Sequence, residues 1–195
     1  MELQAQILAD RQASYVRLRG GFPVPMAGIV YWLAVAGLAL YFPPATQLNL
    51  AFFASGLIFP LALLLAAIFR NNFMKDRTAT GSVLVPAFIS MLLFWPMLVI
   101  TAQSANADAV LVILAIGMSV HWPVIGWSYG RTALYTGHSL LRAIAVVAVW
   151  AFLPSQRFIA IPLAVAIVYA LTVIAIVVDS GQLAKKISAL ERPAP

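Results

Sequence analysis

Long apolar runs separated by short polar breaks dominate the pattern along the chain. Six runs approach the roughly 20 helical residues needed to cross a bilayer core, where lipid offers no partner for an unpaired backbone group. They are Pro25–Phe42, Leu48–Phe69, Ser82–Thr101, Ala109–Trp127, a stretch ending at Leu153, and Phe158–Val178. None of them alternates strictly between apolar and polar residues, as a lipid-facing strand would. The pattern therefore predicts an all-α fold, a polytopic transmembrane bundle with six spans.

The positions of the lysines and arginines predict how this bundle is oriented. Of the 12 basic residues, 11 fall on the side that holds both termini, and only Arg157 falls on the opposite side. Basic loops are retained on the cytoplasmic side of a membrane. Both termini are therefore predicted to be cytoplasmic, and the net charge of +6 belongs mostly to that side.

Three regions follow from these assignments. Residues 1–21 are predicted to form a cytoplasmic segment that lacks the apolar core of a signal peptide. Residues 22–179 hold the six helices, and residues 180–195 form a cytoplasmic tail. Four residues of the first region fall near one helical stripe: Leu3, Ile7, Ser14 and Leu18. This region is either an amphipathic helix on the inner leaflet or a solvated tail.

Composition removes several classes of protein. The chain is 63% hydrophobic and 9% charged, with a mean hydropathy of +0.97 and no cysteine, whereas soluble domains carry about 25% charged residues. No aspartate, glutamate or lysine lies within a predicted span, so carboxylate proton relays, paired-carboxylate catalysis and carboxylate metal sites lack their residues. Two histidines without a thiolate are too few ligands for zinc. We therefore predict no catalytic site, no metal site and no nucleic-acid partner.

The remaining polar chemistry is concentrated in one hairpin, residues 119–142, which holds both histidines of the chain. A helix of about 20 residues that ends at Leu153 begins near Leu134. At a rise of 1.5 Å per residue, His138 then lies about 6 Å and Arg142 about 12 Å inside the boundary. A guanidinium at depth costs at least about 2.5 kcal/mol and needs a partner or water. Arg142 is therefore the main anomaly of the sequence.

Two interpretations of Arg142 remain open at this point. In the first, it belongs to a cytoplasm-facing polar pocket that binds an anionic ligand or a lipid headgroup. The residues proposed for this pocket are Ser119, His121, Tyr135, His138 and Arg142. In the second, the arginine snorkels back to the inner headgroups. No cofactor is predicted, with a haem held by His121 and His138 as the alternative.

These features predict an integral membrane protein that binds or transports a ligand without catalysis, with membrane lipids as partners. The alternative is a structural or regulatory protein that acts through contacts with other membrane proteins. In the first case, binding of the ligand would depend on Arg142. In the second case, a partner membrane protein should copurify with the bundle.

The hairpin carries a histidine, a proline and a Gly-Trp-x-Tyr run, at His121, Pro123, Gly126, Trp127 and Tyr129. Together with the proline-centred run 56–65 it resembles a family of small uncharacterised bacterial multi-pass proteins, a domain of unknown function. The proline stands one position nearer to the histidine than in the pattern of that family. The resemblance implies six spans and a bacterial inner membrane, and it brings no activity.

Overall fold

The computed structural model describes residues 2–78, 80–92, 94–104 and 106–190. Helices make up this part of the chain, which contains no strand. The α-helices are α1 (Glu2–Arg17), α2 (Pro23–Leu38), α3 (Pro44–Ser55), α4 (Ile58–Ile68), α5 (Leu84–Leu92), α6 (Phe94–Ser104), α7 (Ala107–Gly117), α8 (Trp122–Ser128), α9 (Thr132–Phe152) and α10 (Arg157–Leu190). Short 3-10 turns are η1 (Arg19–Gly21), η2 (Gly81–Val83) and η3 (Pro154–Gln156). The predicted all-α class is confirmed.

Several helical stretches of the described residues are long and apolar enough to cross a membrane. Five pass this test on their own: Arg19–Leu38, Gly81–Gln103, Ala107–Ser128, Thr132–Phe152 and Pro154–Leu190. The second predicted span, Leu48–Phe69, corresponds to α3 and α4, which meet at a bend of 52°. The number of spans is therefore five, or six if this bent pair crosses as one unit.

Prolines explain where the spans are interrupted. α4 begins at Ile58 with Pro60 in its first turn, and α8 begins at Trp122 with Pro123 in its first turn. Proline has no N–H to donate to the preceding turn, but the first turn of a helix needs no such bond. The chain therefore breaks just before each proline and restarts there, which divides the fourth predicted span into α7 and α8.

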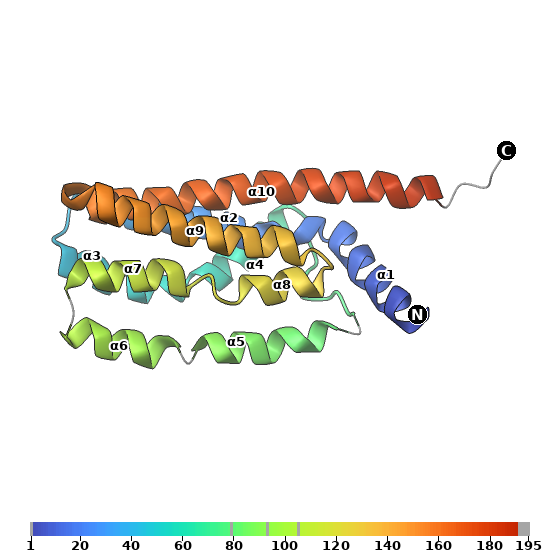
Figure 1. The fold of residues 1–195 in the computed structure, drawn as a ribbon, viewed down its shortest axis with the longest axis horizontal. Helices are drawn as coiled ribbons and strands as arrows, with labels where there is room; N and C mark the ends of the chain where they lie inside the picture. The colour runs from blue at the N-terminus through green and yellow to red at the C-terminus, as the bar shows by residue number, and fades with distance from the viewer. Residues whose placement is uncertain (1, 79, 93, 105, 191–195) are drawn as a thin grey trace.

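The long helix α10 organises the bundle, as Figure 1 shows, and packs along α2, α9 and α7. Close approach of α2 to α10 depends on Gly28, because a Cβ at this position would lie 2.8 Å from the Tyr169 ring. The span formed by α5 and α6 lies at the edge of the bundle in Figure 1. Most of its described side chains are half-buried or exposed.

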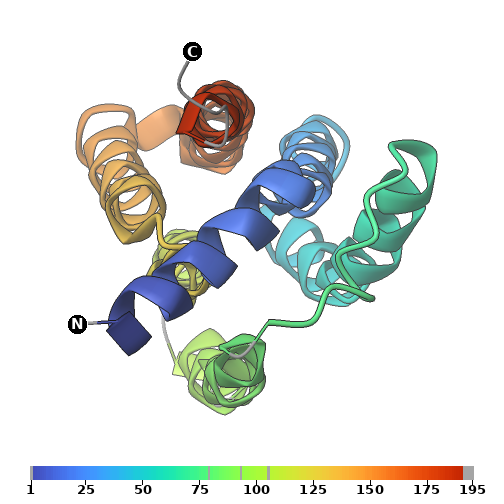
Figure 2. The same ribbon diagram turned by 90° about the vertical axis from the view of Figure 1, so that its right-hand side faces the viewer.

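The helix α1 lies across one end of the bundle, which we call the terminal end because the carboxyl end of α10 also lies there (Figures 1 and 2). Arg17 binds the Asp76 carboxylate through Nε at 3.0 Å and Nη2 at 2.9 Å, and Ser14 donates to the same carboxylate. The link from α1 to α2 contains three consecutive residues at positive φ: Arg19, Gly20 and Gly21. This link turns the chain sharply from the end of the bundle into the first span.

Basic side chains gather at the terminal end. Arg11, Arg17 and Arg19 lie on α1 and η1, and Lys185 and Lys186 lie on the last turns of α10. At the opposite end Arg157 binds Asp108, and both Arg157 and Asp108 also contact Trp150. Arg192, one of the basic residues assigned to the terminal side, lies outside the described residues.

Candidate functional site

Arg142 lies in the middle of α9 and is 0% exposed. Its guanidinium carbon sits 5.2 Å from the centre of the Trp32 ring and 5.1 Å from that of Tyr169. Nη1 donates a hydrogen bond of 2.9 Å to the Tyr169 hydroxyl. The arginine therefore packs inside the bundle between two aromatic rings, an arrangement that stabilises a desolvated cation by about 2 kcal/mol. It does not reach out to the boundary as a snorkelling arginine would.

Two nitrogens of this guanidinium, Nε and Nη2, have no hydrogen-bond partner among the residues that the structure describes. They form one edge of the planar group, on which two N–H bonds point in parallel and match a carboxylate or phosphate. Among the described residues the ion-paired carboxylates of Asp76, Asp108 and Asp179 bind other arginines. Arg142 thus presents a buried cationic edge, and none of these ion pairs of the described residues includes it.

His138 lies one helical turn before Arg142 and is 3% exposed. Its Nδ1 lies 2.7 Å from the Thr172 hydroxyl oxygen on α10, and its Nε2 has no partner in the described part of the chain. The Trp122 ring stacks on the imidazole with centroids 4.0 Å apart, and the Tyr169 ring lies at 4.8 Å. Packed side chains, rather than open space, therefore adjoin this histidine.

Ser119 and His121 lie in the break between α7 and α8. The Ser119 carbonyl, which Pro123 cannot bond, accepts from the Ser139 hydroxyl at 2.9 Å. His121 is half-buried beside the Phe88 ring, 5.4 Å away between centroids, and its Nδ1 has no hydrogen-bond partner within residues 2–78, 80–92, 94–104 and 106–190. The break is therefore tied to α9 by a side chain, and His121 lies on its outer side toward α5.

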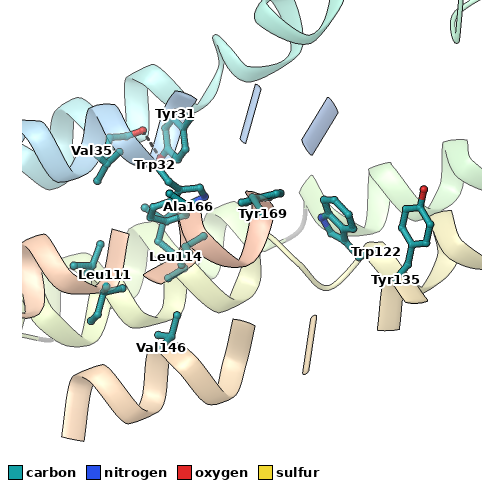
Figure 3. Close-up of a cluster of buried hydrophobic side chains, with 14 of the residues drawn as sticks. Tyr31, Trp32, Val35, Leu111, Leu114, Trp122, Tyr135, Val146, Ala166 and Tyr169 are labelled. Atoms are coloured by element: carbon teal, nitrogen blue, oxygen red, sulfur yellow. Dashed lines mark hydrogen bonds between the residues drawn. The ribbon is translucent and has the colours of Figure 1, made fainter. Parts of the chain in front are cut away.

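Tyr135 closes the cluster toward the terminal end. Its hydroxyl donates to the Gly20 carbonyl at 2.6 Å, and the Tyr129 ring lies 6.0 Å away. Tyr15 of α1 packs against Tyr129 and donates to the Ile176 carbonyl at 3.2 Å. Burial, followed by the nearby Asp179 carboxylate, raises the pKa of Tyr15, so its phenol stays a neutral donor. In Figure 3 the Trp32, Tyr169, Trp122 and Tyr135 rings follow one another toward this end.

The five residues proposed from the sequence therefore occupy different positions in the structure. Arg142 and His138 share one buried cluster, Ser119 and Tyr135 make backbone hydrogen bonds beside it, and His121 faces α5. Ser119, Tyr135, His138 and Arg142 are each at most 3% exposed. The cluster is closed in this structure, so a ligand would enter only after the bundle opens.

Three residues of this cluster were missed in the sequence. Trp32 and Tyr169 enclose the guanidinium, and Thr172 holds His138. Tyr169 and Thr172 are hydroxyl-bearing residues three positions apart in an apolar helix. That spacing places them on one face, which is the signal that could have identified them.

Comparison with known proteins identifies a family. Residues 8–179 match the model of DUF7010, which is described as a family of unknown function. No curated protein and no solved structure matches the chain.

Proposed function

The chain belongs to this family of unknown function, and we propose that it is a multi-pass membrane protein that binds or transports an oxyanion on Arg142. The observation that carries the proposal is the free Nε and Nη2 edge of a guanidinium that is 0% exposed. A buried donor without a partner costs about 1–3 kcal/mol, and more when it is charged. A carboxylate or phosphate would supply two acceptors and the missing negative charge.

Affinity measurements on the purified chain in lipid nanodiscs test this proposal. Acetate, propionate and phosphate are the free probes, and nanodiscs with or without phosphatidylglycerol test a lipid headgroup as the source of the anion. We expect Arg142→Lys to weaken binding by about tenfold or more, because lysine keeps the charge but loses the paired donors. Exposed Arg70→Lys is the matched control and should leave the affinity unchanged.

The outcomes of this experiment separate the sources of the anion. Binding of free anions that needs Arg142 supports a soluble ligand, and competition by phosphatidylglycerol alone supports a headgroup. Equal affinities of wild type and Arg142→Lys for every probe would contradict the proposal.

We propose that the terminal end faces the cytoplasm and that the protein lies in a bacterial inner membrane. The orientation is supported by the basic terminal end described above, since basic segments are retained on the cytoplasmic side. The bacterial inner membrane is what the resemblance of residues 119–142 and 56–65 implies. The chain has no cysteine, so single introduced thiols report their side of the membrane without further changes.

Labelling with a maleimide that does not cross membranes tests this orientation. In spheroplasts, Ser155→Cys in η3 should react at once, whereas Gln4→Cys in α1 should react only after lysis, because the two residues lie at opposite ends of the bundle. The reverse order would place the termini outside. Reaction of both before lysis would contradict a bundle that crosses the membrane in this direction.

The alternative, a role through contacts with other membrane proteins, is supported by the span formed by α5 and α6. Within an apolar 18-residue window of this stretch, the share of residues buried in the bundle is only 7%. An extended apolar face is therefore available to a partner. The alternative would be favoured by a membrane-protein partner that copurifies in a stoichiometric amount after gentle solubilisation. That partner should be lost when small side chains on the exposed face of α5 and α6 are replaced by larger ones.

A further inference from the structure

The hydrogen bonds around Thr172 determine which nitrogen of His138 carries a proton. The Thr172 oxygen lies 2.7 Å from the Val168 carbonyl and 2.7 Å from His138 Nδ1. A hydroxyl has one hydrogen, and a carbonyl can only accept. Each of the two contacts needs its own hydrogen. The Thr172 hydroxyl must therefore donate its hydrogen to the Val168 carbonyl, and His138 Nδ1 must carry the hydrogen that it donates to the Thr172 oxygen.

The neutral imidazole then has its lone pair on Nε2, the nitrogen that lacks a partner. The charged and titratable side chains that act on it are Arg142 on α9, His121 before α8 and Tyr169 on α10, and Tyr135 lies on the Trp122 ring that stacks on the imidazole. None of these carries a carboxylate, and the Arg142 cation opposes a second positive charge. His138 therefore offers the cluster a hydrogen-bond acceptor.

This acceptor and the free edge of Arg142 belong to the same cluster. The two residues are four positions apart on α9, a spacing that places them on one helix face. Tyr169 contacts both, with its ring 4.8 Å from the imidazole and 5.1 Å from the guanidinium carbon. A ligand that satisfies the whole cluster needs oxygen acceptors for Arg142 and for Trp32 Nε1, which also lacks a partner among the described residues, and a donor for His138.

We propose that the oxyanion bound at Arg142 carries a hydroxyl group, as hydroxycarboxylates, hydrogencarbonate and dihydrogen phosphate do. Its charged oxygens accept from Nε and Nη2 of Arg142, and its O–H donates to Nε2 of His138. This inference rests on the proposed function. Thr172 acts as a positioning residue, because it holds the imidazole in the tautomer that accepts.

Matched ligands test the hydroxyl directly in the full chain in nanodiscs. Lactate and propionate differ by one hydroxyl, and wild type should bind lactate about 10- to 100-fold more tightly, because propionate leaves a buried acceptor unpaired. Hydrogencarbonate and phosphate, measured in parallel, distinguish an inorganic anion from a hydroxycarboxylate.

Thr172→Val is the informative variant. It frees Nδ1, so the imidazole can adopt either tautomer, and we expect the preference for lactate to fall at least fivefold while propionate binding persists. Thr101→Val is the matched control, because Thr101 donates to the Met97 carbonyl in the same way on another span. That variant should keep the full preference.

Nitrogen-15 labelling of histidine gives a readout that needs no ligand, since the chain has only two histidines. Wild type should show His138 protonated on Nδ1, and Thr172→Val should show a mixture of tautomers. Protonation on Nε2 in wild type would overturn this inference. Anion binding that needs Arg142 but does not distinguish lactate from propionate would overturn it and leave the proposed function intact, whereas no binding of any anion would overturn both.

Discussion

Replacing Arg142 by methionine together with Tyr169 by phenylalanine is expected to stabilise the bundle by about 1–4 kcal/mol. The double change removes a cation that is 0% exposed and the phenol that partners it. The free energy of unfolding in denaturant, measured in the same detergent for both proteins, is the test. The same variant should lose all binding of oxyanions.

The physical reason is the balance between desolvation and compensation at Arg142. Two of its nitrogens have no hydrogen-bond partner on any described residue, and the two aromatic rings offset only part of the cost of burying the charge. Methionine fills a similar volume without that cost. The phenylalanine is needed because a phenol left without its partner would cost about 1–3 kcal/mol of its own.

Arg157→Met provides the control for this prediction. Arg157 is half-buried, with 21% of its side chain exposed, and it binds Asp108, so its removal should not stabilise the protein. If the double variant unfolded more easily than wild type, Arg142 would be a structural residue. A gain in stability with a loss of binding is typical of a residue retained for function.

Gly20→Ala is expected to destabilise the terminal end by about 2–5 kcal/mol, from left-handed backbone strain and overpacking. Gly20 has a φ of +63°, and a Cβ there would lie 2.2 Å from Ile176 Cγ2 and 2.8 Å from the Tyr15 ring. Its carbonyl also accepts the Tyr135 hydrogen bond. Hydrogen exchange in α1 should accelerate, and the unfolding midpoint should fall.

Gly137→Ala is the matched control on α9. Nothing lies within 4 Å of a Cβ at Gly137, and alanine is favoured over glycine within a helix by about 0.5–1 kcal/mol. This variant should therefore be as stable as wild type or more so. Equal losses in both variants would show that the packing of η1 against α10 does not secure the terminal end.

The length of the apolar runs was enough to predict the helical class and the approximate spans, because a backbone in lipid must satisfy its own hydrogen bonds. Counting back from Leu153 also placed Arg142 inside a span, and α9 begins at Thr132, close to the expected Leu134. These are local properties of the chain, and periodicity and helical rise determine them.

Partners on other helices depend on how those helices rotate and pack. Tyr169 and Thr172 lie 27 and 34 residues beyond the side chains they bind, Arg142 and His138. Which face of α10 meets α9 depends on close packing, including the approach of Gly28 to Tyr169. A pattern along one helix contains no information on that rotation. The sequence alone therefore determined that Arg142 lies within an apolar helical stretch, and only the tertiary structure decided that its guanidinium is buried, that aromatic rings enclose it and that one edge of it is free.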